Sequence, residues 1–296
     1  MTIAACHVSP EGVVLGADST TTITRTLPSG ETRDWSFDYA QKVFEVGESP
    51  STVGLVTWGQ GLIGSCSHRT LAARLAKKHS LVPFDSIEKM TQSLSDDLWT
   101  CYSSEYAAEI QRAHDLLAKG VAGTIQKDEL KEYNKLLAEL SGGYCLAGRI
   151  ESPGECEARV ILWEPQTDKP SIDLVSREAP VFWGVPHIMQ RLIFGLDEGV
   201  VTQILQHPKW TGTLKELFDI IAANQLIQPS HLPIREAIDW IHTVIHTTIR
   251  GVKFAPWPHL CGGPIEIATV TTDRPFRWVC HKEMNAAIVT AQESTW

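Results

Sequence analysis

The stretch MTIAACHVSPEGVVLGADS, residues 1–19, decides how the fold begins. Two short apolar runs, residues 2–8 and 13–18, flank Ser9-Pro10-Glu11-Gly12, in which proline at the second position and glycine at the fourth favour a type I turn. The pattern therefore predicts a β-hairpin at the start of the chain. Because no basic and apolar leader precedes the hairpin, we expect Thr2 to open the first strand.

Strands and helices follow in blocks. A polar, Thr-rich segment extends to about Gln41, and residues 42–46 and 52–57 are predicted to form a second pair of strands. The apolar spacing over residues 62–140 predicts at least three helices. The remaining predictions are strands at 144–149, 158–164, 171–175 and 181–184, helices over 186–250, and a closing hairpin of strands 265–271 and 276–281.

This block order favours an α+β fold. Each run of strands needs cover for its faces, and two packed antiparallel sheets with helices outside each sheet provide it. The expected architecture is a four-layer αββα sandwich. A doubly wound parallel sheet would need strands and helices to alternate one by one, whereas four predicted strands precede the first helix. Residues 1–296 contain no repeat or linker, and we expect one domain with enlarged helical layers.

Composition narrows the class of protein. The net charge is −9, from 26 Lys and Arg against 35 Asp and Glu, so nucleic acid and anionic membranes are disfavoured as partners. The apolar runs are far shorter than the roughly 20 residues that span a bilayer. Seven scattered cysteines without a C-x-x-C pair are typical of reduced thiols. We expect a cytoplasmic protein.

Residues 59–64, Gly59-Gln60-Gly61-Leu62-Ile63-Gly64, match the letters of a dinucleotide-binding fingerprint. That motif needs an acidic residue at the end of a second strand roughly 20 residues later. The acid found there, Asp85, follows Pro83-Phe84 and has the context of a helix N-cap. A tight turn between a strand and a helix is the favoured interpretation, and we expect no cofactor.

Histidines and cysteines offer weaker candidates. His242 and His246 lie four residues apart on a predicted helix and share a face that could bind a metal, but no third ligand is evident, so ordinary helix surface is favoured and we expect no metal. Cys145 and Cys261 are each a candidate nucleophile, although an isolated buried cysteine usually packs as a small hydrophobe. No G-x-S-x-G motif is present.

Thr2 is a stronger candidate for a catalytic nucleophile. Removal of Met1 is the normal fate when the next residue is as small as threonine, and it leaves a hydroxyl and a free α-amine on one residue. The hydroxyl needs a base to become a good nucleophile, and an α-amine, with a pKa of about 7.7–8.0, suits that task near neutral pH. A nearby lysine would keep the amine neutral, and an acid would orient the lysine. Asp18 and Lys42, at strand ends in the first sheet, could both reach Thr2.

Residues 2–4, 12–19, 41–46 and 57–59 resemble the proteasome β-subunit family of N-terminal nucleophile hydrolases. In that family the nucleophilic threonine opens the first strand and an aspartate follows sixteen positions later, as Asp18 follows Thr2. Lys42 has the context of the family lysine, although its connection from Asp18 is longer. Gly59 matches the glycine whose backbone N–H points into the oxyanion hole.

The chain departs from the family at its accessory positions. The family's S-G-G reads Cys261-Gly262-Gly263, the aspartate three residues before it falls at Pro258, and the serine of a G-S-G turn is replaced by Val185. In the family these groups orient and polarise the amine. Their replacement is therefore expected to alter the pH optimum and the rate.

The resemblance implies a threonine peptidase in which Thr2 attacks, Asp18 and Lys42 tune it, and Gly59 stabilises the oxyanion. Thr57 and Gly61 would flank the pocket for the substrate side chain, and Thr57 suggests a modest pocket that is not strongly charged. The implied partners are peptide or unfolded-protein substrates, further copies of the chain in a closed homo-oligomeric ring, and an ATP-dependent unfoldase. Two alternatives stay open: an amidase or acylase for a small amide, and a catalytically silent ring or scaffold protein whose Thr2 stays capped by Met1.

Overall fold

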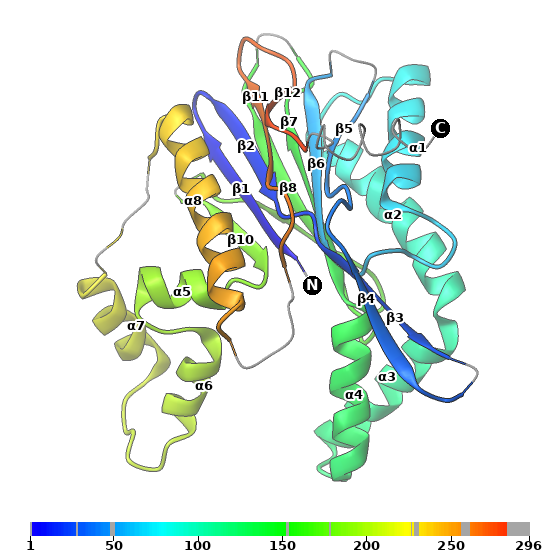
Figure 1. Cartoon of the computed structure of the whole chain (residues 1–296), viewed down its shortest axis with the longest axis vertical. Coiled ribbons are helices and arrows are strands. Elements are labelled where there is room, and N and C mark those ends of the chain that lie inside the picture. Colours follow the sequence, from blue (N-terminus) through cyan, green and yellow to red (C-terminus); the bar gives the residue numbers. More distant parts are fainter. Residues whose placement is uncertain are drawn as a thin grey trace, which may run out of the picture.

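The computed structural model describes residues 2–27, 29–47, 51–151, 154–177, 179–225, 227, 231–255 and 261–282. Two five-stranded antiparallel sheets and a set of helices make up a mixed α+β fold (Figure 1). The predicted α+β class is therefore confirmed. Within the described residues, no helix combines the length and the apolar character needed to cross a bilayer.

The first sheet joins the two ends of the chain. The predicted N-terminal hairpin is present, with Ser9 paired to Gly12, and the closing hairpin adds to it along the second strand. This register places Glu266 opposite Ala17. In sheet order the strands are β10 (Val181–Gly184), β1 (Ile3–Ser9), β2 (Gly12–Ala17), β11 (Glu266–Thr271) and β12 (Arg277–Cys280).

The second sheet is built from the middle of the chain. Its strands β6, β7, β8 and β9 pair in sequence order, although α1 to α4 lie between β6 and β7 in the chain. The predicted strands in these regions are confirmed within a few residues. In sheet order they are β5 (Val43–Glu45), β6 (Val53–Gly59), β7 (Gly142–Gly148), β8 (Glu157–Trp163) and β9 (Ser171–Leu174).

The polar segment before Gln41 differs from the prediction, because it forms a separate hairpin of β3 (Thr21–Thr26) and β4 (Thr32–Phe37). Six strands, not four, thus precede the first helix. Its threonines favour extended backbone because they are β-branched. No alternation of apolar residues marks a buried face in the sequence of this hairpin, and Trp35 and Phe37, whose burial is described, are 39% and 52% exposed.

Helices follow the first two blocks of strands. The helical region from residue 85 to 117 is divided at Tyr106, whose φ of −113° and ψ of 29° are not helical. Ser86, not Asp85, is the N-cap of the second helix, and its side chain accepts from the Lys89 N–H. The helices are α1 (His68–Leu81), α2 (Ile87–Glu105), α3 (Ala107–Val121), α4 (Lys127–Leu140), α5 (His187–Phe194), α6 (Glu198–Gln206), α7 (Leu214–Ala223) and α8 (Ile234–Val252).

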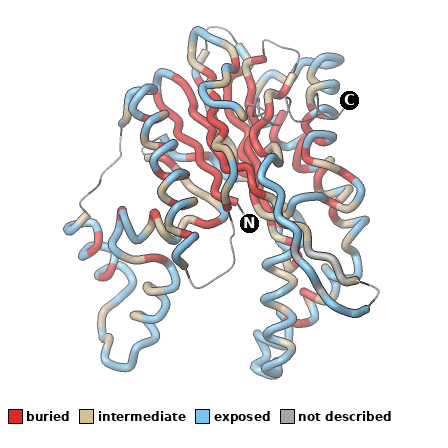
Figure 2. The backbone as a smooth tube through the Cα atoms, viewed as in Figure 1, coloured by how far each residue is buried: buried red, intermediate tan, exposed pale blue. Residues whose placement is uncertain are grey.

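The three largest apolar clusters hold most of these elements together. One lies between the two sheets and includes Leu15 and Val56; a second joins the second sheet to α1 and α2; a third joins the first sheet to α8. Buried residues follow the strands of both sheets, whereas α3, α4, α6 and α7 are mostly exposed (Figure 2).

The alternation of side chains along β1 sets the position of the N-terminus. Ala4, Cys6 and Val8 enter the cluster between the sheets, whereas Ile3 and Ala5 enter the cluster under α8. Successive side chains of a strand point to opposite faces. Thr2 has the same parity as Ala4, so its side chain belongs to the side that faces the second sheet.

Candidate active site

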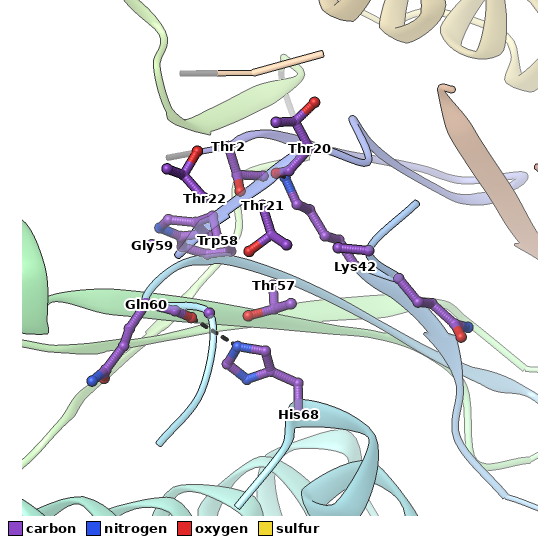
Figure 3. Close-up of a pocket in the computed structure, with 13 residues that line it drawn as sticks. Thr2, Thr20, Thr21, Thr22, Lys42, Thr57, Trp58, Gly59, Gln60 and His68 are labelled. Carbon is purple, nitrogen blue, oxygen red and sulfur yellow. Dashed lines mark hydrogen bonds between the residues drawn. The ribbon is translucent and has the colours of Figure 1, made fainter. Parts of the chain in front are cut away.

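A polar pocket lies at the end of the space between the two sheets, and Thr2 is part of its wall (Figure 3). Lys42 lies directly before β5, and Thr57, Gly59 and Gly61 come from β6 and the turn after it. Five of the six predicted site residues therefore line one pocket. The sixth, Asp18, lies behind it in contact with Lys42.

Asp18 ties the first strand to the rest of the site. Its carboxylate is fully buried and accepts hydrogen bonds at both oxygens. Oδ1 accepts from the Ile3 N–H at 3.1 Å and from Lys42 Nζ at 2.7 Å; Oδ2 accepts from the Thr20 N–H at 3.2 Å and the Gly262 N–H at 2.8 Å. Four donors use the acceptor positions of the carboxylate. The residue next to Thr2 is thus fixed to the group that holds the lysine.

Asp18 and the backbone of Thr20 hold the Lys42 ammonium. Lys42 Nζ donates to Asp18 Oδ1 and, at 2.5 Å, to the carbonyl oxygen of Thr20, and Figure 3 shows its side chain extending toward Thr2 and Thr20. Burial lowers the pKa of Lys42, and Asp18 acts against that shift. The lysine therefore parts with its proton more readily than a lysine in water.

The two charged groups do not come from the same sheet, which corrects the prediction. Asp18 follows β2 in the first sheet, whereas Lys42 precedes β5 in the second. The Thr57 N–H donates to the Lys42 carbonyl at 3.0 Å and anchors the lysine to β6. The ion pair thus bridges the two sheets beside Thr2.

Gly59 ends β6 at a backbone conformation that favours glycine. Its φ is +83°, and a Cβ there would lie 2.5 Å from the Ser141 carbonyl oxygen. α1 begins at His68, four residues after Gly64, and β6 belongs to an antiparallel sheet. The glycine-rich stretch therefore opens no helix and lacks the parallel strand arrangement of a dinucleotide site.

Thr57 and Gly61 border the pocket, as expected. Thr57 Oγ1 donates to the Gly143 carbonyl at 3.2 Å, and a Cβ on Gly61 would lie 3.2 Å from Thr21 Oγ1. The hairpin of β3 and β4 thus contributes one wall of the pocket. Among the described residues that line it, none carries a carboxylate. The pocket is lined by hydroxyl, amide and imidazole groups beside the Lys42 ammonium.

His68 is a pocket residue that the sequence did not reveal, because it is an isolated histidine at the start of a helix. Its Nδ1 lies 2.6 Å from the Tyr144 hydroxyl and its Nε2 lies 2.8 Å from the Gln60 carbonyl oxygen. The carbonyl requires a donor, so Nε2 carries the proton and Nδ1 accepts from the tyrosine. Burial lowers the pKa of His68 to about 4, so the ring is neutral at pH 7.

The buried His68 predicts an acid-sensitive fold. In the unfolded chain a histidine takes up a proton below about pH 6.5, whereas folded His68 does so only near pH 4. The contribution of His68 to the free energy of unfolding is therefore complete above pH 6.5. It decreases by about 3 kcal/mol as the pH falls to 4. Urea unfolding at pH 7 and pH 4 should show this excess loss in the wild type relative to His68→Gln. Equal losses in the two proteins would contradict it.

Two of the residues that stand where the family has accessory serines, Val185 and Cys261, are buried near the site. Val185 packs in the cluster under α8 and has no hydroxyl to offer, while Gly184 before it, at φ +88°, lets β10 approach the Thr2 carbonyl, which a Cβ would meet at 1.8 Å. Cys261 is 3% exposed, and the backbone N–H of its neighbour Gly262 donates to Asp18. Pro258 and Met1 lie outside the described residues.

The alternative nucleophiles and the alternative metal ligands lack the surroundings that these roles need. Burial raises the pKa of Cys261 to about 12 and that of Cys145 well above its usual value, so neither thiol is activated at neutral pH. His246 Nε2 lies 3.4 Å from Arg250 Nε, and its ring stacks on that of His242. No group of three His, Cys, Asp or Glu side chains suited to a metal occurs in the described part of the chain.

Comparisons with known proteins identify no family. No protein-family model matches the sequence, and no curated protein matches it. Among solved structures, the chain is similar to the Anbu (Gly-1) mutant from Hyphomicrobium sp. strain MC1, with 11% sequence identity and a TM-score of 0.47 over 99% of this chain and 96% of that chain. The chemistry of the site therefore rests on its own geometry.

Proposed function

We propose that the protein is an N-terminal threonine hydrolase that cleaves peptide bonds, with Thr2 as the nucleophile once Met1 is removed. The observation that carries this proposal is the buried pair of Lys42 and Asp18, which bridges the sheets beside Thr2. A buried ion pair is often no more stabilising than apolar residues of similar volume. Its presence at the wall of a polar pocket therefore favours chemistry over a silent scaffold.

The reaction begins with a proton transfer within Thr2. The α-amine takes the hydroxyl proton while Oγ attacks the carbonyl carbon of the substrate, and the backbone N–H of Gly59 receives the developing oxyanion. The amine of the leaving group then takes the proton and departs. The acyl group remains as an ester on Thr2. Water, deprotonated by the same α-amine, hydrolyses the ester and restores free Thr2.

Lys42 assists this transfer by charge and by hydrogen bonding. An ammonium has three N–H donors, and Asp18 and the Thr20 carbonyl accept two of them. The third serves Thr2 Oγ and stabilises negative charge there as the proton leaves. The positive charge also keeps the neighbouring α-amine neutral.

A second pocket favours a peptide over a small amide. It shares Thr2 and Gly59 with the first pocket, and its other walls are mainly apolar, with Leu137, Leu162 and Trp163. A nucleophile bordered by two pockets suits a substrate with side chains near the scissile bond. A small-amide acylase would need only one of them.

The same proposal includes the wider architecture expected from the sequence. The three apolar clusters support a four-layer αββα sandwich in which residues 1–296 form one domain. A cytoplasmic homo-oligomeric ring, which encloses the sites and receives unfolded chains from an ATP-dependent unfoldase, stays a prediction.

The substrate side of the proposal is tested with a peptide library and small amides. We expect hydrolysis of peptides with a small uncharged side chain at the scissile bond, and much slower hydrolysis of small amides. In Thr21→Asp the new carboxylate in the pocket should raise the relative cleavage after basic residues about tenfold. Thr124→Asp, on an exposed loop, should leave the preference unchanged. An unaltered preference in Thr21→Asp would contradict the assignment of this pocket.

A further inference from the structure

A second ion pair, between the buried Glu266 and the partly buried Lys282, lies near Lys42. Glu266, in β11, is fully buried. Its Oε2 accepts from the Lys42 backbone N–H at 3.4 Å and lies 3.2 Å from Lys282 Nζ, and its Oε1 lies 2.9 Å from His281 Nδ1. Glu266 therefore contacts the backbone of one lysine and the ammonium of another.

Three acceptors hold the Lys282 ammonium. Besides Glu266, its ammonium donates to the Ala40 carbonyl at 2.7 Å and to Ser19 Oγ at 3.3 Å, and its side chain is 10% exposed. These three acceptors match its three N–H donors. Ser19 adjoins Asp18 and Ala40 lies two residues before Lys42, so Lys282 connects the two segments that present the catalytic pair.

We propose that Lys282, fixed by Glu266, is a positioning residue for Lys42: it joins the segment that carries Asp18 to the segment that carries Lys42 and adds a second positive charge to their network. Neither residue belongs to the set implied by the family resemblance. The catalytic role of Lys282 rests on the proposed function, whereas its effect on Lys42 is a property of the fold and is measured separately.

The charges that act on Lys42 come from several elements. Asp18 after β2 stabilises its protonated form, and Lys282 after β12 disfavours it. Cys261 lies before β11, and His68, at the start of α1, is neutral. Glu266 is negative, but Lys282 balances it. Loss of Lys282 would remove a like charge and leave Glu266 unbalanced, and both changes favour protonated Lys42.

The test is a titration of Lys42 in the full chain, followed by NMR of ¹³Cε-labelled lysines and assigned with Lys42→Arg. In Lys282→Gln the midpoint of Lys42 should rise by about one pH unit. Lys282→Arg keeps the charge and should leave the midpoint near that of the wild type. Lys127→Gln removes an exposed lysine of α4 and should not move it. An unchanged midpoint in Lys282→Gln would overturn the proposal.

Glu266→Gln gives a second test, in which the Lys42 midpoint should shift in the opposite direction. This test is needed if Lys282→Gln does not fold. It leaves the Lys282 ammonium without its carboxylate, so the midpoint of Lys42 should fall; a rise would overturn the proposal. The pH dependence of Thr2 acylation by an electrophilic ester, measured in parallel, should move with the Lys42 midpoint. If wild-type Thr2 is never acylated, the proposed function fails, while the titration still decides the role of Lys282.

Discussion

Thr2→Ala is expected to reduce peptide hydrolysis at least about a thousand-fold, because the variant lacks the only atom proposed to form the acyl bond. The fold should persist, since alanine keeps the Cβ and the backbone contacts of Ile3 with Asp18 do not depend on the Thr2 side chain. Initial rates on the preferred library peptide, at equal concentrations of folded protein, measure the loss.

Thr2→Ser is the matched control. Serine is small enough for Met1 removal and keeps a hydroxyl on the same carbon, so this variant should retain measurable turnover and form an ester with the electrophilic probe. Turnover by Thr2→Ala at the wild-type rate would contradict the assignment of the nucleophile. So would loss of all activity in Thr2→Ser while Met1 is removed and the fold is intact.

Lys42→Met is expected to cause the largest loss of stability, together with a loss of activity. It leaves the Asp18 carboxylate, which is fully buried, without its counter-ion. Removal of one partner of a buried pair typically lowers the free energy of unfolding by about 3–5 kcal/mol. Hydrolysis should fall about a hundred-fold or more, because the hydrogen bond and charge supplied to Thr2 are lost. Urea unfolding and initial rates measure the two effects.

A double-mutant cycle separates the two effects of Lys42→Met. Asp18→Asn removes the negative charge and keeps the shape, so the variant with both changes should be more stable than the sum of the single losses predicts. Activity should not return with stability, because the ammonium is still missing. Additive losses of stability would contradict a direct interaction between Lys42 and Asp18.

The strands were predictable where their apolar side chains pack into a core. Residues 2–8 and 13–18 carry apolar side chains toward two different clusters, and the structure places both strands as expected. The hairpin of β3 and β4 was missed because its threonines favour strands without marking a buried face. The break at Tyr106 has no mark in the apolar spacing, which continues through it into α3.

The site was predictable only in part. Thr2, Lys42 and Gly59 were named from local motifs, and they do line one pocket, although Lys42 reaches it from the opposite sheet to the one expected. Glu266 and Lys282 act on residues more than 220 positions earlier in the chain. No local pattern reports such a contact, because the pairing of the closing hairpin with β2 creates it.

The central claim is that Thr2 becomes a free N-terminal nucleophile beside Lys42. Intact mass and N-terminal sequencing of untagged protein, followed by reaction with an electrophilic ester and peptide mapping, test it most directly. We predict loss of Met1 and a single acyl adduct on Thr2 that is absent in Thr2→Ala and strongly slowed in Lys42→Met. A retained Met1, or a free Thr2 that never reacts, would contradict the account.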